Sequence, residues 1–207
     1  MRRALWLLGL AAAMLVSGCS DAKPSSAPDS PESAPAPTTT PEAPAGSQFD
    51  LEAFDAQAVE GQGPSGEVLR TRVIGALDRY LTEAVVRPLR SGEPAGGLDA
   101  VFGGLAVSRL TGPDRAALVD EGLPPVTDVD VETATVKVSA LNGPSGTGVV
   151  VAAIRLSVTG RVGKTPVTIE RTGELLLAPE GETWKVHGYD IRVTRDTAAG
   201  TTTLQAP

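Results

Sequence analysis

Cysteine and histidine are almost absent from this chain of 207 residues, which holds one of each, Cys19 and His187. A single cysteine cannot form a disulfide within the chain. Zinc sites take three or four ligands, mostly cysteine sulfur and histidine nitrogen, so these two residues are too few to build one. The sequence therefore predicts no disulfide framework, no metal centre and no cofactor.

Long hydrophobic runs are missing too. The longest apolar stretch, residues 4–16, follows the basic start Arg2-Arg3. A helix needs about 20 residues to cross the bilayer core, so this stretch is too short for a permanent span. A basic start, a short apolar stretch and then small residues are typical of a secretory signal peptide. Residues 1–18 are predicted to be such a signal, with the general and the twin-arginine export routes both open.

The signal ends in Leu15-Val16-Ser17-Gly18-Cys19, which resembles the lipobox of bacterial lipoproteins. The alternative is an ordinary signal peptide with a chance cysteine. The resemblance implies cleavage before Cys19 and a diacylglyceryl group on its sulfur, and two acyl chains are enough for stable membrane anchoring. It places the protein on the extracytoplasmic face of the cell membrane. Arginine far outnumbers lysine, a bias typical of high-GC genomes such as those of actinobacteria.

Positive charge is scarce. The chain has 18 basic and 25 acidic residues, a net charge of −7, and loss of residues 1–18 would remove two arginines and no acid. Affinity for nucleic acids comes largely from cations that meet phosphates, so nucleic acid is not an expected partner. Anionic lipid headgroups offer no attraction either, which leaves the membrane contact to the lipid on Cys19.

Residues 19–47 have no aromatic residue and no Val, Leu or Ile, but seven prolines. Such a segment cannot bury enough apolar surface to offset the entropy lost on ordering. It is predicted to be a disordered Pro/Ala/Ser-rich tether. Residues 48–64 are a short docking segment or further linker, and both interpretations stay open. Residues 65–196 are expected to form the globular domain, and residues 197–207 a flexible tail.

The first half of the domain has helical periodicity. Over 67–87, apolar residues recur at steps of three and four, which predicts an amphipathic helix that ends before Pro88. A short apolar stretch follows at 98–105. Thr111-Gly112-Pro113-Asp114 has the composition of a helix start, and Gly122 suits the end of that helix.

After Pro125 the apolar period changes to two, the period of half-buried strands. Four strands are predicted, at 129–140, 150–158, 167–177 and 184–193. Gly- and Pro-containing turns separate them, so the strands form an antiparallel meander. The phase slips within the first strand and again at His187-Gly188, where a β-bulge is expected.

Helices followed by strands predict an α+β fold. The element order over 65–196 and the Trp184-Lys185-Val186 segment in the last strand resemble NTF2-like (cystatin-like) domains. That resemblance implies N-terminal helices packed on a curved four-stranded antiparallel sheet, together forming a cone. Domains of this kind include enzymes, ligand binders and assembly modules, so the resemblance names no function.

Candidate functional residues are few. In an NTF2-like cone five side chains would line an apolar cavity, with core packing as the alternative: Tyr80, Phe102, Trp184, His187 and Tyr189. His187 is the best single candidate because bulges gather near functional sites. Asp128, Asp130 and Glu132 point to one side of a strand, and a solvated face is favoured over a cation site. Gly163-Lys164-Thr165 is a hairpin turn, since a phosphate-binding loop needs a helix after it.

No catalytic constellation is apparent. The leading hypothesis is a lipid-anchored extracytoplasmic module that binds an apolar small molecule or lipid, or a protein partner of the cell envelope. One alternative is an NTF2-like enzyme that uses the cone cavity, with an acid or His187 as the active group. The other is a structural assembly subunit of an envelope complex.

Overall fold

The computed structural model describes residues 48–56, 66–92, 97–143 and 146–207. The expected signal peptide, Cys19 and the tether lie outside these residues, as do 57–64 of the segment with two interpretations. Those expectations therefore stay predictions. Among the described residues, no helix combines the length and apolar character needed to cross a bilayer.

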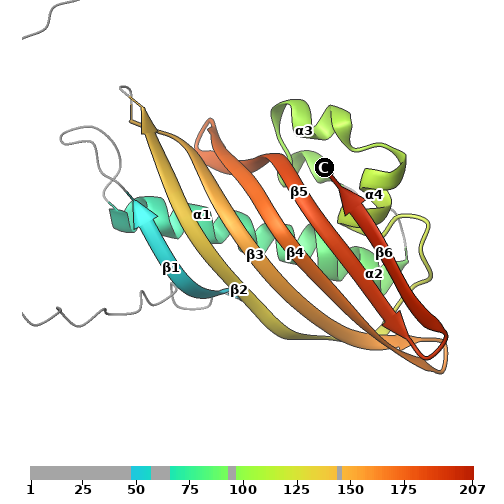
Figure 1. Ribbon diagram of the computed structural model, residues 1–207. Helices are drawn as coiled ribbons and strands as arrows, with labels where there is room; N and C mark the ends of the chain where they lie inside the picture. The colour runs from blue at the N-terminus through green and yellow to red at the C-terminus, as the bar shows by residue number, and fades with distance from the viewer. Residues whose placement is uncertain (1–47, 57–65, 93–96, 144–145) are drawn as a thin grey trace, which may run out of the picture. The chain divides into compact units, whose positions relative to one another are not determined.

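A six-stranded sheet dominates the fold, with the strands side by side in sequence order (Figure 1). Strands β2 to β6 pair antiparallel with their neighbours, whereas β1 pairs parallel to β2. The strands are β1 (Asp50–Ala56), β2 (Thr127–Gly143), β3 (Gly146–Val162), β4 (Thr165–Glu180), β5 (Thr183–Thr197) and β6 (Gly200–Ala206).

Alternation of apolar and polar residues produces one buried and one solvated face. In β3 the buried positions Val150, Ala152, Ile154, Leu156 and Val158 alternate with partly or fully exposed residues. Two predicted irregularities are confirmed. The register of β2 shifts between Val131 and Thr133, and Leu176 and Leu177 pair with Gly188 and Val186, which leaves His187 as the extra residue of a bulge.

The first helical segment is longer than predicted. It consists of α1 (Gly66–Arg79), a π-helical stretch η1 (Tyr80–Val86) and α2 (Arg87–Ser91) without a break. The expected end before Pro88 is wrong. Pro88 lies inside this continuous segment, directly after the π-helical turn in which the Arg87 N–H donates to the Thr82 carbonyl. The end comes at Gly92, whose φ of 65° is left-handed.

Three short helices connect this segment to the sheet: η2 (Leu98–Ala100), α3 (Gly104–Arg109) and α4 (Gly112–Val119). The start of α4 at Gly112 agrees with the predicted start at Thr111–Asp114. Its end does not fall at Gly122. Asp120 takes the left-handed conformation at the helix end, with φ 54°. Asp120 is buried at this position.

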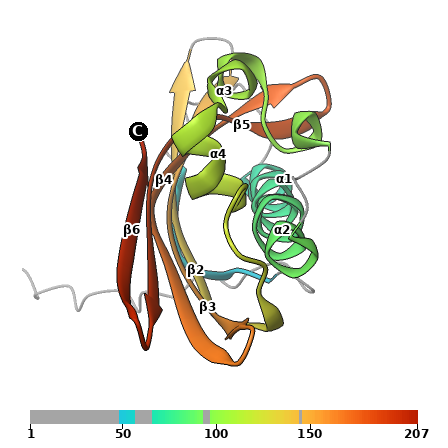
Figure 2. The ribbon, with the colours of Figure 1, turned by 90° about the vertical axis from the view of Figure 1, so that its right-hand side faces the viewer.

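The helices cover one face of the sheet, which curves around α1 and α2 (Figure 2). The core lies between these two layers. From the helices, Leu69, Val73, Leu77 and Leu81 are buried, and they belong to the same cluster as the inward side chains of β2 to β5. The other face of the sheet is mostly polar, with Leu176 of β4 as an exposed apolar residue.

The predicted fold class is wrong. The sheet has six strands rather than four, and it is mixed rather than antiparallel. The helices do not open the fold, because β1 precedes them and they occupy its middle. The fifth and sixth strands are β1, within the segment of undecided structure, and β6, within the expected tail. The NTF2-like cone therefore has no support in this structure.

Candidate functional site

Two arginines lie on the apolar face of the sheet. Arg171 falls in phase with Ile169 and Leu175 in β4, and Arg195 in phase with Val193 in β5. Arg171 is 0% exposed and Arg195 is 7% exposed. Removing a charge from water is costly unless partners compensate for the lost hydration. The groups around Arg171 and Arg195 therefore show how these two buried charges are stabilised.

Arg171 is held by the end of α4. One terminal nitrogen donates to the carbonyls of Ala117 at 2.6 Å and Leu118 at 3.0 Å, and the other pairs with the Asp120 carboxylate. These carbonyls belong to the last turn, where a helix lacks its own donors. Arg171 thus joins the middle of β4 to α4, and Asp120 supplies the counter-charge.

Arg195 is held more loosely. It donates to Asp120 Oδ1 at 3.4 Å and to the Pro124 carbonyl at 3.3 Å. A guanidinium has five N–H donors, and within the described ranges two of those of Arg195 make these hydrogen bonds. Burial lowers the pKa of Arg195, and the neighbouring Arg171 adds to that effect, while Asp120 opposes it. Two guanidinium groups share one carboxylate, and the buried cluster keeps a net positive charge.

A pocket of about 290 Å³ adjoins Arg195. Its walls come from three segments at one end of the sheet: the α4–β2 connection, the β3–β4 hairpin and the β5–β6 hairpin (Figure 1). Most of the lining is apolar or threonine, and Arg195 is its one charged member. The lining residues are Leu123, Pro124, Val162, Thr165, Val167, Arg195, Thr197, Ala199 and Thr202.

Three of the residues predicted to line a cavity pack together, Tyr80 and Phe102 within the core and Tyr189 partly buried against it. The rings of Tyr80 and Phe102 meet edge to face at 6.2 Å, and those of Phe102 and Tyr189 at 6.3 Å. Burial raises the pKa of both tyrosines. The Tyr189 hydroxyl donates to Asp114 Oδ2 at 2.8 Å. The buried Tyr80 hydroxyl faces Arg171, which opposes the effect of burial on its pKa.

Trp184 and His187 lie near the N-terminal end of β5, whereas Arg195 lies near its C-terminal end. Trp184 is buried in the core. His187 Nε2 is 3.6 Å from Glu180 Oε2, and the other oxygen of that carboxylate accepts from Lys185 Nζ at 2.8 Å. Lys185 lowers the pKa of Glu180. None of the five candidates lines the pocket beside Arg195, so their role in a cavity stays a prediction.

The acidic run at the start of β2 does not form a cation site in the structure. Asp128 has a left-handed φ of 52°, and Glu132 accepts a hydrogen bond from the Thr159 hydroxyl at 3.0 Å. Within the described ranges, no three His, Cys, Asp or Glu side chains gather closely enough to hold a metal.

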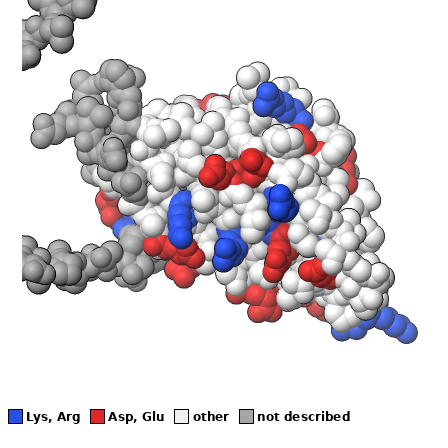
Figure 3. Space-filling view, in the orientation of Figure 1, with Lys and Arg blue, Asp and Glu red and all other residues white. Residues whose placement is uncertain are grey.

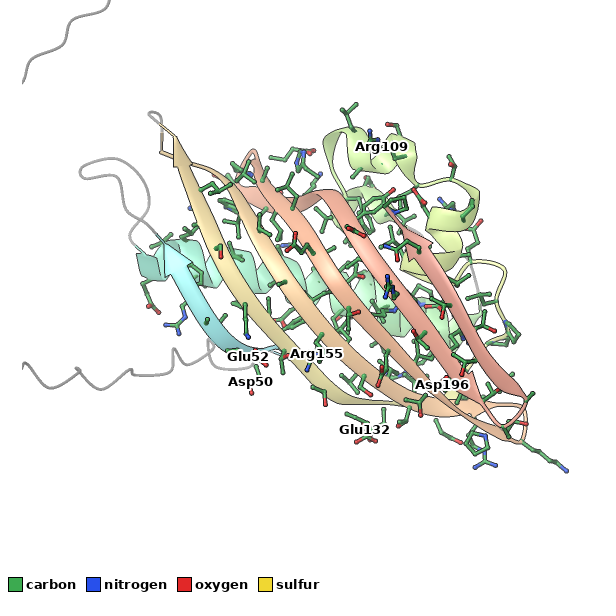
Figure 4. All side chains as sticks on the ribbon, in the orientation of Figure 1. Asp50, Glu52, Arg109, Glu132, Arg155 and Asp196 are labelled. Carbon is green, nitrogen blue, oxygen red and sulfur yellow. The ribbon has the colours of Figure 1, made fainter. Side chains whose placement is uncertain are left out.

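The outer face of the sheet carries charges of both signs in alternation (Figure 3). Lys137 Nζ lies 3.3 Å from Glu52 Oε2 across β1 and β2, and Arg155 of β3 lies beside Glu52 (Figure 4). Lys137 lowers the pKa of Glu52. Because neighbouring charges neutralise each other, this face presents no field of one sign for a charged macromolecule.

Sequence reasoning missed Arg171, Arg195 and Asp120, although a signal for the two arginines was present. Each occupies an inward position of an apolar alternation, in phase with valine, isoleucine and leucine. A charged residue in phase with the core is rarely buried unless it has a partner. Asp120 carries no comparable signal, because its contact with Arg171 spans 51 residues of sequence.

No protein-family model, curated protein or solved structure matches this chain. The fold and the site describe the chain instead: it has a curved six-stranded mixed sheet with helices on one face, and a pocket beside a buried arginine cluster.

Proposed function

We propose that this chain is a lipid-anchored extracytoplasmic binding module that takes an apolar small molecule into the pocket between the β3–β4 and β5–β6 hairpins. The observation that carries the proposal is the pocket itself. Leu123, Val162 and Ala199 stay partly or fully exposed around it, although most apolar side chains of the domain are packed in the core. Its volume of about 290 Å³ is near the lower end of the range for ligand sites, roughly 300–1,000 Å³.

The anchoring part of the proposal rests on the sequence. The lipobox-like Leu15–Cys19 segment supports lipidation of Cys19, and the proline-rich tether supports a domain held at a distance from the membrane. A binding domain tethered in this way samples ligands close to the membrane surface.

The other hypotheses fare differently. The enzyme alternative depended on an NTF2-like cone, and it loses its basis with that fold. Binding of an envelope protein and assembly into an envelope complex stay alternatives. Both predict that a side chain placed in the pocket leaves binding to the protein partner unchanged.

Blocking the pocket should abolish small-molecule binding. Thr202 of β6 lines the pocket and is exposed. Thr202→Trp therefore places an indole in the space that a ligand needs. We expect the affinity for 1-octanol, a simple apolar probe, to fall at least about tenfold, the equivalent of losing roughly 1.4 kcal/mol of contacts. Chemical-shift titration of the full chain carrying Cys19→Ser measures this.

The matched control is Thr203→Trp, which adds the same ring to the adjacent residue on the outer face of the sheet. Thr203 pairs with Thr194 and does not line the pocket. Its affinity for octanol should equal that of the unsubstituted chain. Two outcomes would contradict the proposal that this pocket is a ligand site: no octanol binding by the chain without a tryptophan substitution, or equal octanol affinity of both tryptophan variants.

Cys19→Ser should release the protein from the membrane. Without the thiol no thioether to a diacylglyceryl group can form, and the remaining chain is acidic and lacks a long apolar run. We expect nearly all of the protein to move from the membrane fraction to the aqueous fraction after cell fractionation. Ser30→Ala, in the same tether, is the control and should stay with the membrane. Retention of the Cys19→Ser protein in the membrane fraction would refute lipid anchoring at this residue.

A further inference from the structure

The ligand of this pocket can be specified further from the charge beside it. We infer that it is an amphipathic carboxylate, whose anionic group binds the Arg195 guanidinium while its apolar part fills the space between the hairpins. This inference rests on the proposed function, because it assigns a ligand class to the same pocket.

The charge balance of the buried cluster is the first argument. Arg171 and Arg195 both face Asp120, and the three groups together carry one uncompensated positive charge. The shorter contact of Asp120 is with Arg171, and its contact with Arg195 is 3.4 Å long. A buried charge without a full partner is costly, so one additional negative charge beside Arg195 would stabilise the cluster.

The hydrogen bonds of Arg195 give the second argument. Its two hydrogen bonds, at 3.4 and 3.3 Å, are longer than the usual 2.7–3.2 Å of N–H···O bonds. Among the described residues, these two bonds occupy two of the five N–H donors of the guanidinium. A guanidinium presents paired donors in a plane, and a carboxylate matches them with two parallel acceptors. The site thus has unused donors with the geometry for that ion.

The position of Arg195 gives the third argument. The same side chain contacts Asp120 and lines the pocket, and Pro124 both accepts its hydrogen bond and forms part of the wall. The rest of the lining is apolar residues and threonines. One cation at the inner side of an otherwise apolar wall is the complement of a molecule with one anionic end. Because the surplus is a single charge, a carboxylate fits it better than a phosphate dianion.

Octanoate and 1-octanol test the inference, because they have the same chain length and differ in the charged end. We expect the full chain with Cys19→Ser to bind octanoate at least about tenfold more tightly than octanol, the gain expected from one charge-assisted hydrogen bond. Arg195→Gln should remove this preference and leave octanol binding in place. The control Arg192→Gln makes the same change on the same strand, on the outer face, and should keep the preference.

The outcomes separate this inference from the proposed function. If octanol and octanoate bind equally, or if Arg195→Gln keeps the preference for octanoate, the carboxylate assignment is overturned and the pocket stands. If neither probe binds, both proposals fail. Tighter binding of octyl phosphate than of octanoate would also overturn the assignment.

A measurement on the chain without any change at Arg195 covers the case in which Arg195→Gln does not fold. Octylammonium places a positive charge where the carboxylate is expected, so it should bind more weakly than octanol. Equal or tighter binding of octylammonium would overturn the inference without use of any variant at Arg195.

Discussion

Asp120→Ala should unfold the domain far more easily than most single substitutions, because it leaves two buried guanidinium groups without a counter-charge. Asp120 pairs with both Arg171 and Arg195, and its side chain is 3% exposed. Removing one partner of a buried ion pair typically costs about 3–5 kcal/mol. We expect a loss of that size in the free energy of unfolding, measured by urea denaturation with the slope of the transition compared between variants.

A double substitution separates the charge effect from lost packing. Asp120→Ala with Arg171→Met removes one charge of each sign, so the cluster keeps the single positive charge that it has in the native protein. This variant should be more stable than Asp120→Ala alone, although the carbonyls of Ala117 and Leu118 lose their donor.

An exposed aspartate is the matched control for the same change. Asp196 lies next to Arg195 on the outer face of β5 (Figure 4), and its contact there is a hydrogen bond from the Thr201 hydroxyl. Asp196→Ala should cost less than about 1 kcal/mol, as expected for an exposed hydrogen bond. If Asp120→Ala costs no more than Asp196→Ala, the buried cluster does not stabilise this fold.

Strands β2 to β5 could be predicted from sequence because each has one buried and one solvated face. That arrangement enforces an alternation of period two, and a shift by one residue would turn the apolar side chains to water. The same rule makes a bulge visible as a break in phase. The extra residue His187 was identified in this way, since Trp184 and Val186 precede the break and Tyr189 and Ile191 follow it.

The two outer strands could not be predicted in the same way. In β1 the register shifts between Leu51 and Ala53, which interrupts the alternation after a single step. Its parallel pairing with β2 joins segments far apart in sequence, and no local pattern encodes that. In β6, threonines occupy three successive positions from Thr201. Threonine favours strands, but Leu204 and Ala206 alone are too few to show an apolar period.

Part of the candidate site could be predicted from the sequence. Arg171 and Arg195 stand in phase with core residues of their strands, so their inward direction follows from the alternation once it is applied to charged residues as well as apolar ones. The identity of their partner does not follow. Asp120 and Arg195 are 75 residues apart, and they meet only because α4 packs against β5 and β6. The pocket depends on that packing too, since the α4–β2 connection forms one of its walls.

Gly173→Ala should be the other severe substitution, because the backbone at Gly173 leaves no room for a side chain. Gly173 lies in the middle of β4 with φ 147°, where L-amino acids are strained. An added Cβ would stand 2.0 Å from the carbonyl oxygen of Asp190 and 3.0 Å from Cα of Ile191. Both neighbours are backbone atoms of the paired strand β5, so relief requires the two strands to separate.

The expected cost of Gly173→Ala is at least about 3 kcal/mol, from backbone strain of roughly 1–3 kcal/mol and overpacking of similar size. Gly148→Ala in β3 is the matched control: an added Cβ there meets nothing within 4 Å, so its stability should be unchanged or slightly higher. Urea denaturation measures both variants, and amide hydrogen exchange should show protection lost first where β4 pairs with β5. Because the strained glycine sits two residues from Arg171, separation of the strands would also loosen the buried cluster. A Gly173→Ala protein as stable as the Gly148→Ala protein would mean that β4 and β5 do not approach as closely here as the structure has them.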